Sequence, residues 1–139
     1  MVIQNEEVIS HDIDISMYEF TLSPWQQNAI WGIINNKHVI VSAPTGSGKT
    51  LPAEYAIHYF SKLNKKIIYT TPIKALSNQK KFDFMEKFPE ISTGILTGDI
   101  KDNPEADVIL MTTEILNNYF AFSLSIKLIA SIKSKALVS

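Results

Sequence analysis

The chain has 139 residues, of which 45% are hydrophobic, and a formal net charge of −1. This length predicts a single domain, and the absence of cysteine excludes a disulfide framework and a thiolate metal site. The near-neutral charge gives no electrostatic signature of nucleic-acid binding, so such a function would depend on local motifs. No basic leader and no long apolar run is present. We therefore expect an intracellular protein that is neither secreted nor membrane-bound.

The first nineteen residues carry only a weak alternation of polar and apolar side chains, most clearly from Asp12 to Ile15. Such a pattern is compatible with a short strand or with an extended lead-in. In a strand, the carboxylates of Asp12 and Asp14 would share one face. A solvated edge explains them better than a catalytic pair does.

A helix is predicted to begin after Ser23. Ser23 is a favourable cap and Pro24 suits the first helical turn, and apolar residues then recur at helical spacing as far as Ile34. Gln26 stands where its side chain would close a capping box with Ser23. A glutamine amide also forms paired hydrogen bonds with the edge of adenine. Because a phosphate-binding loop follows, we favour the adenine interpretation.

The most informative motif is a glycine-containing loop between an apolar run, Val39 to Val41, and a helical pattern, Ala53 to Tyr59. The loop predicted to bind a nucleotide consists of Ala43, Pro44, Thr45, Gly46, Ser47, Gly48, Lys49 and Thr50. Its backbone N–H groups would cradle a polyphosphate, Lys49 would reach the β- and γ-phosphates, and the Thr50 hydroxyl would bind Mg²⁺. The strict pattern has Gly at the first position, where this chain has Ala43. The alternative is an ordinary Gly-Ser turn before Lys-Thr.

Further apolar runs predict additional strands, separated by helical patterns. The strands are expected near residues 67–70, 91–96 and 107–111, and the helices near residues 73–88 and from 115 onward. This alternation predicts an α/β fold with a mainly parallel sheet. Ligands of such sheets bind beyond the carboxyl ends of the strands. The loops expected there are rich in hydroxyls, glycine, lysine and acids, which is typical of a phosphate-reading surface.

Several of these segments resemble the motifs of superfamily 2 DExH-box RNA helicases of the Ski2/Mtr4 type. The matching segments are residues 20–26 (Q-motif region), 43–50 (motif I), 69–80 (motif Ia), 97–99 (motif Ib) and 111–116 (motif Ic). The family form of motif I accounts for Ala43. The resemblance covers roughly residues 18–117 and implies a partial RecA-like domain of the P-loop NTPase class.

The resemblance implies ATP and Mg²⁺ as cofactors and single-stranded RNA as a partner. The residues that it assigns to the RNA backbone are Pro72, Lys74, Ser77, Asn78, Gln79, Gly98, Asp99, Thr112, Thr113 and Glu114. Lysines, hydroxyls, amides and helix N-termini bind phosphate oxygens without reading the bases. We therefore expect RNA binding that is independent of sequence.

The chain departs from the family after Glu114. The family continues with an Asp-Glu-x-His strand, motif II, whose acids hold Mg²⁺ and activate the attacking water. Here no acidic residue follows Glu114, and the chain contains no arginine. We therefore assign no catalytic residue and expect a domain truncated before motif II. Three interpretations remain: a helicase completed by a second chain, a non-catalytic nucleotide- and RNA-binding fragment, and a non-functional remnant.

The predicted organisation has three parts. They are a lead-in (1–19), a partial helicase ATP-binding domain (20–117) and a divergent tail (118–139). The tail either forms an amphipathic helix over exposed core or comes from an out-of-frame or truncated coding end. In the family, the strands of motifs II and III lie near the middle of the sheet. We therefore expect uncovered strand edges and poor solubility.

Overall fold

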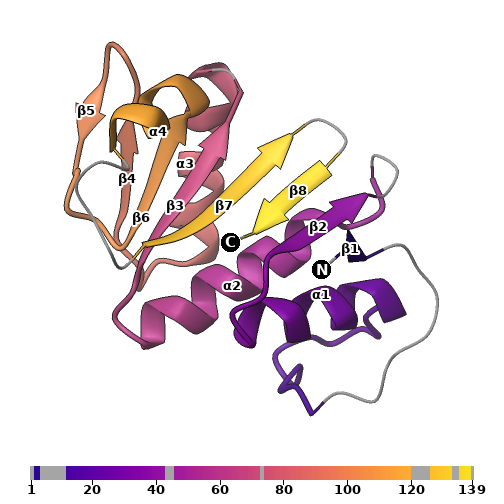
Figure 1. The fold of residues 1–139 in the computed structure, drawn as a ribbon. Coiled ribbons are helices and arrows are strands. Elements are labelled where there is room, and N and C mark those ends of the chain that lie inside the picture. Colours follow the sequence, from indigo (N-terminus) through magenta and orange to yellow (C-terminus); the bar gives the residue numbers. More distant parts are fainter. Residues whose placement is uncertain are drawn as a thin grey trace.

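The computed structural model describes residues 2–3, 12–42, 46–72, 74–119, 126–132 and 135–138. These residues form one sheet with helices packed against it (Figure 1). The strands are β1 (Val2–Ile3), β2 (Val39–Ser42), β3 (Lys66–Thr71), β4 (Thr93–Leu96), β5 (Lys101–Asp102), β6 (Val108–Thr112), β7 (Ile126–Ile132) and β8 (Lys135–Val138). The helices are α1 (Pro24–Ile34), α2 (Thr50–Lys62), α3 (Lys74–Lys87) and α4 (Thr113–Tyr119).

The order of the strands across the sheet is β1-β2-β8-β7-β3-β6-β4-β5. The pairs β1–β2, β7–β3, β3–β6 and β6–β4 are parallel, whereas β8 and β5 pair antiparallel with their neighbours. The α/β fold with a mainly parallel sheet is therefore confirmed. It is the architecture expected of part of a RecA-like domain.

Both faces of the sheet are covered at β3 and β6, which explains why these central strands are apolar throughout. Successive side chains of a strand point to opposite faces. In β3, Ile67 and Tyr69 belong to a core shared with α1, α2 and α3, whereas Ile68 belongs to a second core shared with α4. In β6, Leu110 and Met111 divide between the same two cores. The large core therefore lies on the α1–α3 face.

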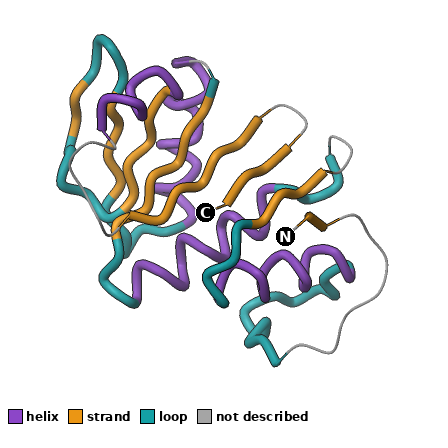
Figure 2. Tube along the Cα trace, viewed as in Figure 1, coloured by secondary structure: helices purple, strands orange, loops and turns teal. Residues whose placement is uncertain are grey.

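Within the lead-in (1–19), Val2–Ile3 form the short strand β1, whereas the segment from Asp12 to Ile15 is an anchored loop. Residues 12–23 form a loop in Figure 2 and not a strand. The Tyr55 hydroxyl of α2 donates a hydrogen bond to the Asp14 carbonyl oxygen over 2.8 Å. Ile13 and Ile15 pack against the small cluster that contains Tyr55 and Leu22. This segment thus packs against α1 and α2.

Of the two interpretations given for the tail, the amphipathic helix is contradicted by the structure. Residues 126–132 and 135–138 are strands β7 and β8. They lie between β2 and β3, and the C-terminus lies near the middle of the fold (Figure 1). The expected uncovered edges of β2 and β3 are therefore paired. Poor solubility stays a prediction.

Two local boundaries also differ from the predictions. Lys101–Asp102, which lies between the strands expected at 91–96 and 107–111, forms the short edge strand β5 opposite β4. Helix α4 begins at Thr113, two residues before its expected start. No helix within the described residues is both long and apolar enough to cross a bilayer.

Candidate functional site

The phosphate loop joins β2 to α2, and its second half is described from Gly46 onward. Gly46 and Gly48 have φ angles of 81° and 83°, a left-handed conformation that glycine adopts at little cost. They deliver the chain to Thr50, the first residue of α2. The first N–H groups of a helix lack intrahelical partners and can bind an anion. The predicted binding residues Ala43, Pro44 and Thr45 lie outside the described residues.

Lys49 is the residue immediately before α2, and its ammonium is the most informative atom of the loop. The Nζ atom is buried and has no hydrogen-bond partner among the described residues. Burying an unpaired cation is costly, so this position fits a phosphate. Thr50 follows it, half-buried at the start of the helix, where its hydroxyl fits the role of a Mg²⁺ ligand. Among the described residues, no cluster of three or more His, Asp or Glu side chains forms a metal site.

Gln26 lies against the loop and serves both as a cap and as a loop contact. The Ser23 N–H donates a hydrogen bond to Gln26 Oε1 over 2.9 Å, which belongs to the predicted capping box. Gln26 Nε2 in turn donates to the carbonyl oxygen of Gly48 over 3.2 Å. The amide keeps a second N–H and a second lone pair for a ligand. The structure places the side chain beside the phosphate loop, and recognition of adenine by Gln26 stays a prediction.

The three loops predicted to hold RNA lie at one edge of the sheet. β3 and β6 pair in parallel up to Thr71↔Thr112, and β4 and β6 up to Leu96↔Met111, so their carboxyl ends are adjacent. The assigned residues that are exposed on this edge are Pro72, Asn78, Gln79, Gly98, Asp99, Thr113 and Glu114. Lys74 is the first residue of α3. The edge therefore carries backbone and side-chain groups suited to phosphate oxygens.

Two of the assigned RNA residues are buried. Ser77 is 0% exposed and shares a hydroxyl–hydroxyl hydrogen bond with Thr71 at the end of β3. Thr112 is 3% exposed, and its Oγ1 has no partner among the described residues. Thr113 Oγ1 donates to the Thr71 carbonyl oxygen over 3.5 Å. Ser77 is thus placed to hold the start of α3. Thr71 was not among the predicted site residues, although it belongs to a Thr-Thr-Pro step that ends a strand.

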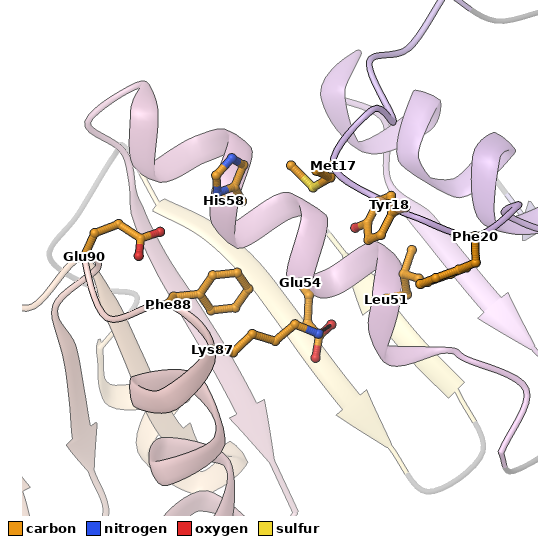
Figure 3. A pocket seen from close by; sticks show the side chains of 9 residues that line it. All are labelled: Met17, Tyr18, Phe20, Leu51, Glu54, His58, Lys87, Phe88 and Glu90. Atoms are coloured by element: carbon orange, nitrogen blue, oxygen red, sulfur yellow. Dashed lines mark hydrogen bonds and ion pairs between the residues drawn. The ribbon is translucent and has the colours of Figure 1, made fainter.

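A separate pocket of about 430 Å³ lies between the lead-in, α2 and the end of α3 (Figure 3). Its lining consists of Met17, Tyr18, Phe20, Leu51, Glu54, His58, Lys87, Phe88 and Glu90. The Lys87 ammonium forms an ion pair with the Glu54 carboxylate. Phe20 and Leu51 line one end, close in sequence to Gln26 and the phosphate loop, and His58 and Glu90 line the other. The pocket is apolar with a charged rim.

Two tyrosines beside this pocket hold their protons tightly. Burial raises the pKa of Tyr18 to about 12, with smaller contributions from Glu54 and Tyr55. Burial also raises the pKa of Tyr55, and the carboxylate of Asp14 adds to this effect. The two rings stack with their centroids 6.5 Å apart. Both phenols therefore stay neutral in the physiological range.

Comparisons with known proteins assign the chain to a family. The sequence profile of a family described as DEAD/DEAH box helicase matches residues 23–135, so it extends beyond residue 117, where the resemblance was expected to end. The chloroplastic DExH-box ATP-dependent RNA helicase DExH15 of Arabidopsis thaliana is 46% identical over 112 residues, 81% of this chain and 10% of that protein.

Two further relatives give the same result. The antiviral helicase SKI2 of Saccharomyces cerevisiae is 46% identical over 101 residues, 73% of this chain and 8% of that protein. The human exosome RNA helicase MTR4 is 46% identical over 101 residues, 73% of this chain and 10% of that protein. The chain thus spans about a tenth of the length of the relatives it matches. It belongs to the DEAD/DEAH box helicase family, among DExH RNA helicases of the Ski2/Mtr4 type.

Proposed function

We propose that this chain is the ATP-binding and single-stranded-RNA-binding N-terminal part of an ATP-dependent RNA helicase. The observation that carries the proposal is the buried Nζ of Lys49, which has no hydrogen-bond partner in the part of the chain that the structure describes. Lys49 directly precedes α2 and follows two glycines with positive φ. A buried ammonium requires an anion to offset its desolvation. The polyphosphate of a nucleotide supplies that anion at the position where the loop also offers backbone N–H groups.

Gln26 supports the choice of nucleotide. Its hydrogen bond to Gly48 links the first turn of α1 to the phosphate loop, and its remaining donor and acceptor match the edge of adenine. Mg²⁺ would bind the phosphates together with the Thr50 hydroxyl and would compensate part of their charge. In this proposal ATP is the ligand, Lys49 and the loop hold its phosphates, and Gln26 holds its base.

The proposal for RNA depends on the edge formed by the carboxyl ends of β3, β4 and β6. The groups gathered there are hydroxyls, amides, one acid-bearing turn and the N-terminus of the fourteen-residue helix α3. Such groups bind the sugar-phosphate backbone and do not distinguish bases. The same edge carries the phosphate loop, because β2 runs parallel to β3 through the hairpin β8–β7. Nucleotide and RNA would therefore occupy neighbouring loops of one sheet edge.

The nucleotide proposal is tested by titrating labelled ATP against Lys49→Ala, with Lys62→Ala as the matched control. Lys62 is exposed in the last turn of the same helix α2. We expect Lys49→Ala to weaken binding at least about tenfold, which corresponds to roughly 1.4 kcal/mol or more. Lys62→Ala should leave the affinity unchanged. Equal affinities for wild type and Lys49→Ala would refute the assignment of the phosphate loop.

The RNA proposal is tested by measuring the salt dependence of binding to single-stranded RNA of unrelated sequences. Lys74→Ala should lower the salt slope by about one unit, because one phosphate contact is lost. Lys65→Ala is the control, since Lys65 directly precedes β3 at the opposite end of the strands. Binding that ignores salt, or that requires one sequence, would contradict this part of the proposal.

Turnover is not expected from the 139-residue chain alone. Phosphoryl transfer requires a carboxylate that fixes Mg²⁺ and a group that orients water. At the edge formed by the carboxyl ends of the strands, the described acids are Asp99 and Glu114, which the proposal assigns to RNA. We expect a second polypeptide segment to supply the missing groups in an active helicase. Multiple-turnover ATP hydrolysis by the purified chain, in a preparation free of other ATPases, would refute this expectation.

A further inference from the structure

Helix α3 is held against the sheet unevenly along its length. The second half is anchored by two buried aromatic rings, those of Phe84 and Phe88, and Phe84 packs edge-on against Tyr69 of β3 with the ring centroids 5.1 Å apart. Within residues 75–83, the described side chains are exposed or half-buried except that of Ser77, which is buried. Apolar packing therefore fixes the end of the helix and does not fix its beginning.

An ion pair adds little to the first half of α3. Lys81 pairs with Asp102 of the edge strand β5, and the side chain of Asp102 is largely exposed. Exposed ion pairs contribute little to stability because water screens them. The buried contact of Ser77 is therefore the feature that attaches this half of the helix to the sheet.

The hydroxyl of Ser77 lies against Thr71, the last residue of β3. The two hydroxyls share a hydrogen bond, and both side chains are buried. The carbonyl oxygen of Thr71 also accepts a hydrogen bond from Thr113 Oγ1 over 3.5 Å, and Thr71 pairs with Thr112 of β6. Thr71 therefore contacts the beginnings of α3 and α4, the two helices that follow strands of the predicted RNA edge.

The contact between Ser77 and Thr71 also fixes the rotation of α3 about its own axis. An α-helix has 3.6 residues per turn, so each residue is turned by about 100° from the one before it. With Ser77 buried against the sheet, the next two residues, Asn78 and Gln79, are exposed, and Lys74 begins the same helix. These three residues are predicted to hold the RNA backbone. Their presentation therefore depends on a hydrogen bond that they do not make themselves.

We propose that Thr71 is a positioning residue of the RNA site: through Ser77, its hydroxyl holds the first half of α3 in the orientation that binds the sugar-phosphate backbone. The inference rests on the proposed binding of single-stranded RNA. Both hydroxyls are buried between the helix and the sheet, so they act without touching RNA. Removing the Thr71 hydroxyl takes a buried partner from Ser77, which is costly. The first half of α3 then leaves the sheet more often, and RNA affinity falls with the fraction of chains in which it stays in place.

The first measurement is amide hydrogen exchange in the free 139-residue chain, which needs no ligand. Thr71→Val keeps the shape of the side chain and removes its hydroxyl. We expect exchange in residues 78–82 to become at least about fivefold faster, whereas residues 84–87, beside the buried rings, keep the wild-type rate. Thr93→Val is the matched control, because Thr93 is also buried but begins β4 at the opposite end of the strands. In that variant the first half of α3 should exchange as in wild type.

The second measurement is the affinity for single-stranded RNA over a range of salt concentrations. Thr71→Val should weaken binding about fivefold at each concentration and leave the salt slope unchanged, because no phosphate contact is removed. Loss of a direct phosphate contact would instead lower the slope by about one unit. Thr71→Ser keeps the hydroxyl and should bind as wild type does, and so should Thr93→Val. Far-UV circular dichroism and urea unfolding verify that each variant is folded, and Ser77→Ala removes the same hydrogen bond from its other end if Thr71→Val does not fold.

The two measurements separate the positioning role from the function on which it rests. Unchanged exchange in Thr71→Val would refute the attachment of α3 through Thr71. Faster exchange with unchanged RNA affinity would refute the positioning role and leave RNA binding standing. A lower salt slope in Thr71→Val, or a failure of Thr71→Ser to restore binding, would refute an action through Ser77. If wild type binds no RNA, the proposed RNA function fails, and the positioning role fails with it whatever the exchange rates are.

Discussion

Replacing the two glycines of the phosphate loop by alanine separates backbone strain from the contact with Gln26. Gly46 and Gly48 have nearly the same φ, 81° and 83°, so both substitutions place a Cβ in the left-handed region. A Cβ on Gly46 would meet nothing within 4 Å, whereas a Cβ on Gly48 would lie 2.6 Å from Gln26 Nε2. Gly46→Ala is therefore the matched control for Gly48→Ala.

The expected magnitudes follow from these contacts. The left-handed conformation costs a non-glycine residue roughly 1–2 kcal/mol, and both variants lose about this amount of unfolding free energy. Gly48→Ala also displaces the Gln26 amide, which is the movable end of a flexible side chain. The hydrogen bond from Gln26 Nε2 to the Gly48 carbonyl oxygen, 3.2 Å long, is lost at an additional cost of about 0.5–1.5 kcal/mol. Gly48→Ala should therefore be the less stable variant by about 1 kcal/mol.

The assay is urea unfolding of wild type, both single variants, Gln26→Ala and the double variant Gln26→Ala/Gly48→Ala. Removing Gln26 eliminates both the clash and the hydrogen bond, so the two substitutions should be non-additive by about 1 kcal/mol in a double-mutant cycle. Gln26→Ala combined with Gly46→Ala should be additive. Equal stability of the two glycine variants, or additivity in the Gly48 cycle, would refute the contact between α1 and the loop.

Three further substitutions test the packing and titration of the fold. Tyr18→Phe should raise the pH at which the protein unfolds in alkali. The pKa of Tyr18 is about 12 in the fold against an ordinary 10.0, so the unfolded state ionises first and wild type loses stability as the pH rises from 10 toward 12. Phenylalanine does not ionise, and an unchanged alkaline transition would contradict this. Phe84→Ala should cost about 3–5 kcal/mol in urea unfolding, since Phe84 is 1% exposed, whereas Phe82→Ala on the same helix should cost less than about 0.5 kcal/mol, since Phe82 is 69% exposed. Gly94→Ala should destabilise by about 1–3 kcal/mol, because its Cβ would lie 2.1 Å from a backbone carbonyl oxygen, whereas Gly98→Ala meets nothing within 4 Å and should be neutral in the same measurement.

The sequence predicted the parts of the fold that depend on local pattern. The apolar runs at β2, β3 and β6 and the helical spacing of α1 and α2 were recognisable because each element buries a face with its own period. The mainly parallel sheet followed from their alternation. The position of the phosphate loop between β2 and α2 followed from its glycines and from Lys49. These features need no knowledge of distant contacts.

The hairpin β7–β8 was not predicted, because its place in the sheet depends on pairing between segments far apart in the chain. Ile126 pairs with Lys66, and Lys135 pairs with Ser42. Nothing in the alternation of this segment indicates which edges it will join. The apolar run resembles an amphipathic helix as closely as it resembles a strand. The partner strands, and not the segment itself, decide its structure.

In the candidate site, too, some features follow from local sequence patterns and others only from tertiary packing. Lys49 and Gln26 were identified from their motifs, but the hydrogen bond from Gln26 to Gly48 joins residues 22 positions apart and follows from packing of α1 against α2. Ser77 was assigned to RNA as part of a motif, whereas its burial depends on which face of α3 meets β3. Sequence patterns therefore identify groups with suitable chemistry. Tertiary packing decides which of them reach the ligand.

The sheet order gives the hairpin a mechanical role between the two predicted ligand sites. The phosphate loop follows β2, and the predicted RNA loops follow β3, β4 and β6. Between β2 and β3, hydrogen bonding across the sheet runs only through β8 and β7 in the described structure. Helix α2 packs against both β2 and the strands β3 and β6, but packing alone permits small sliding motions. The spacing between the phosphate loop and the RNA edge is therefore set by the register of this hairpin, and a variant that breaks the pairing of β8 with β2 should weaken nucleotide binding while leaving the β3–β6–β4 edge intact.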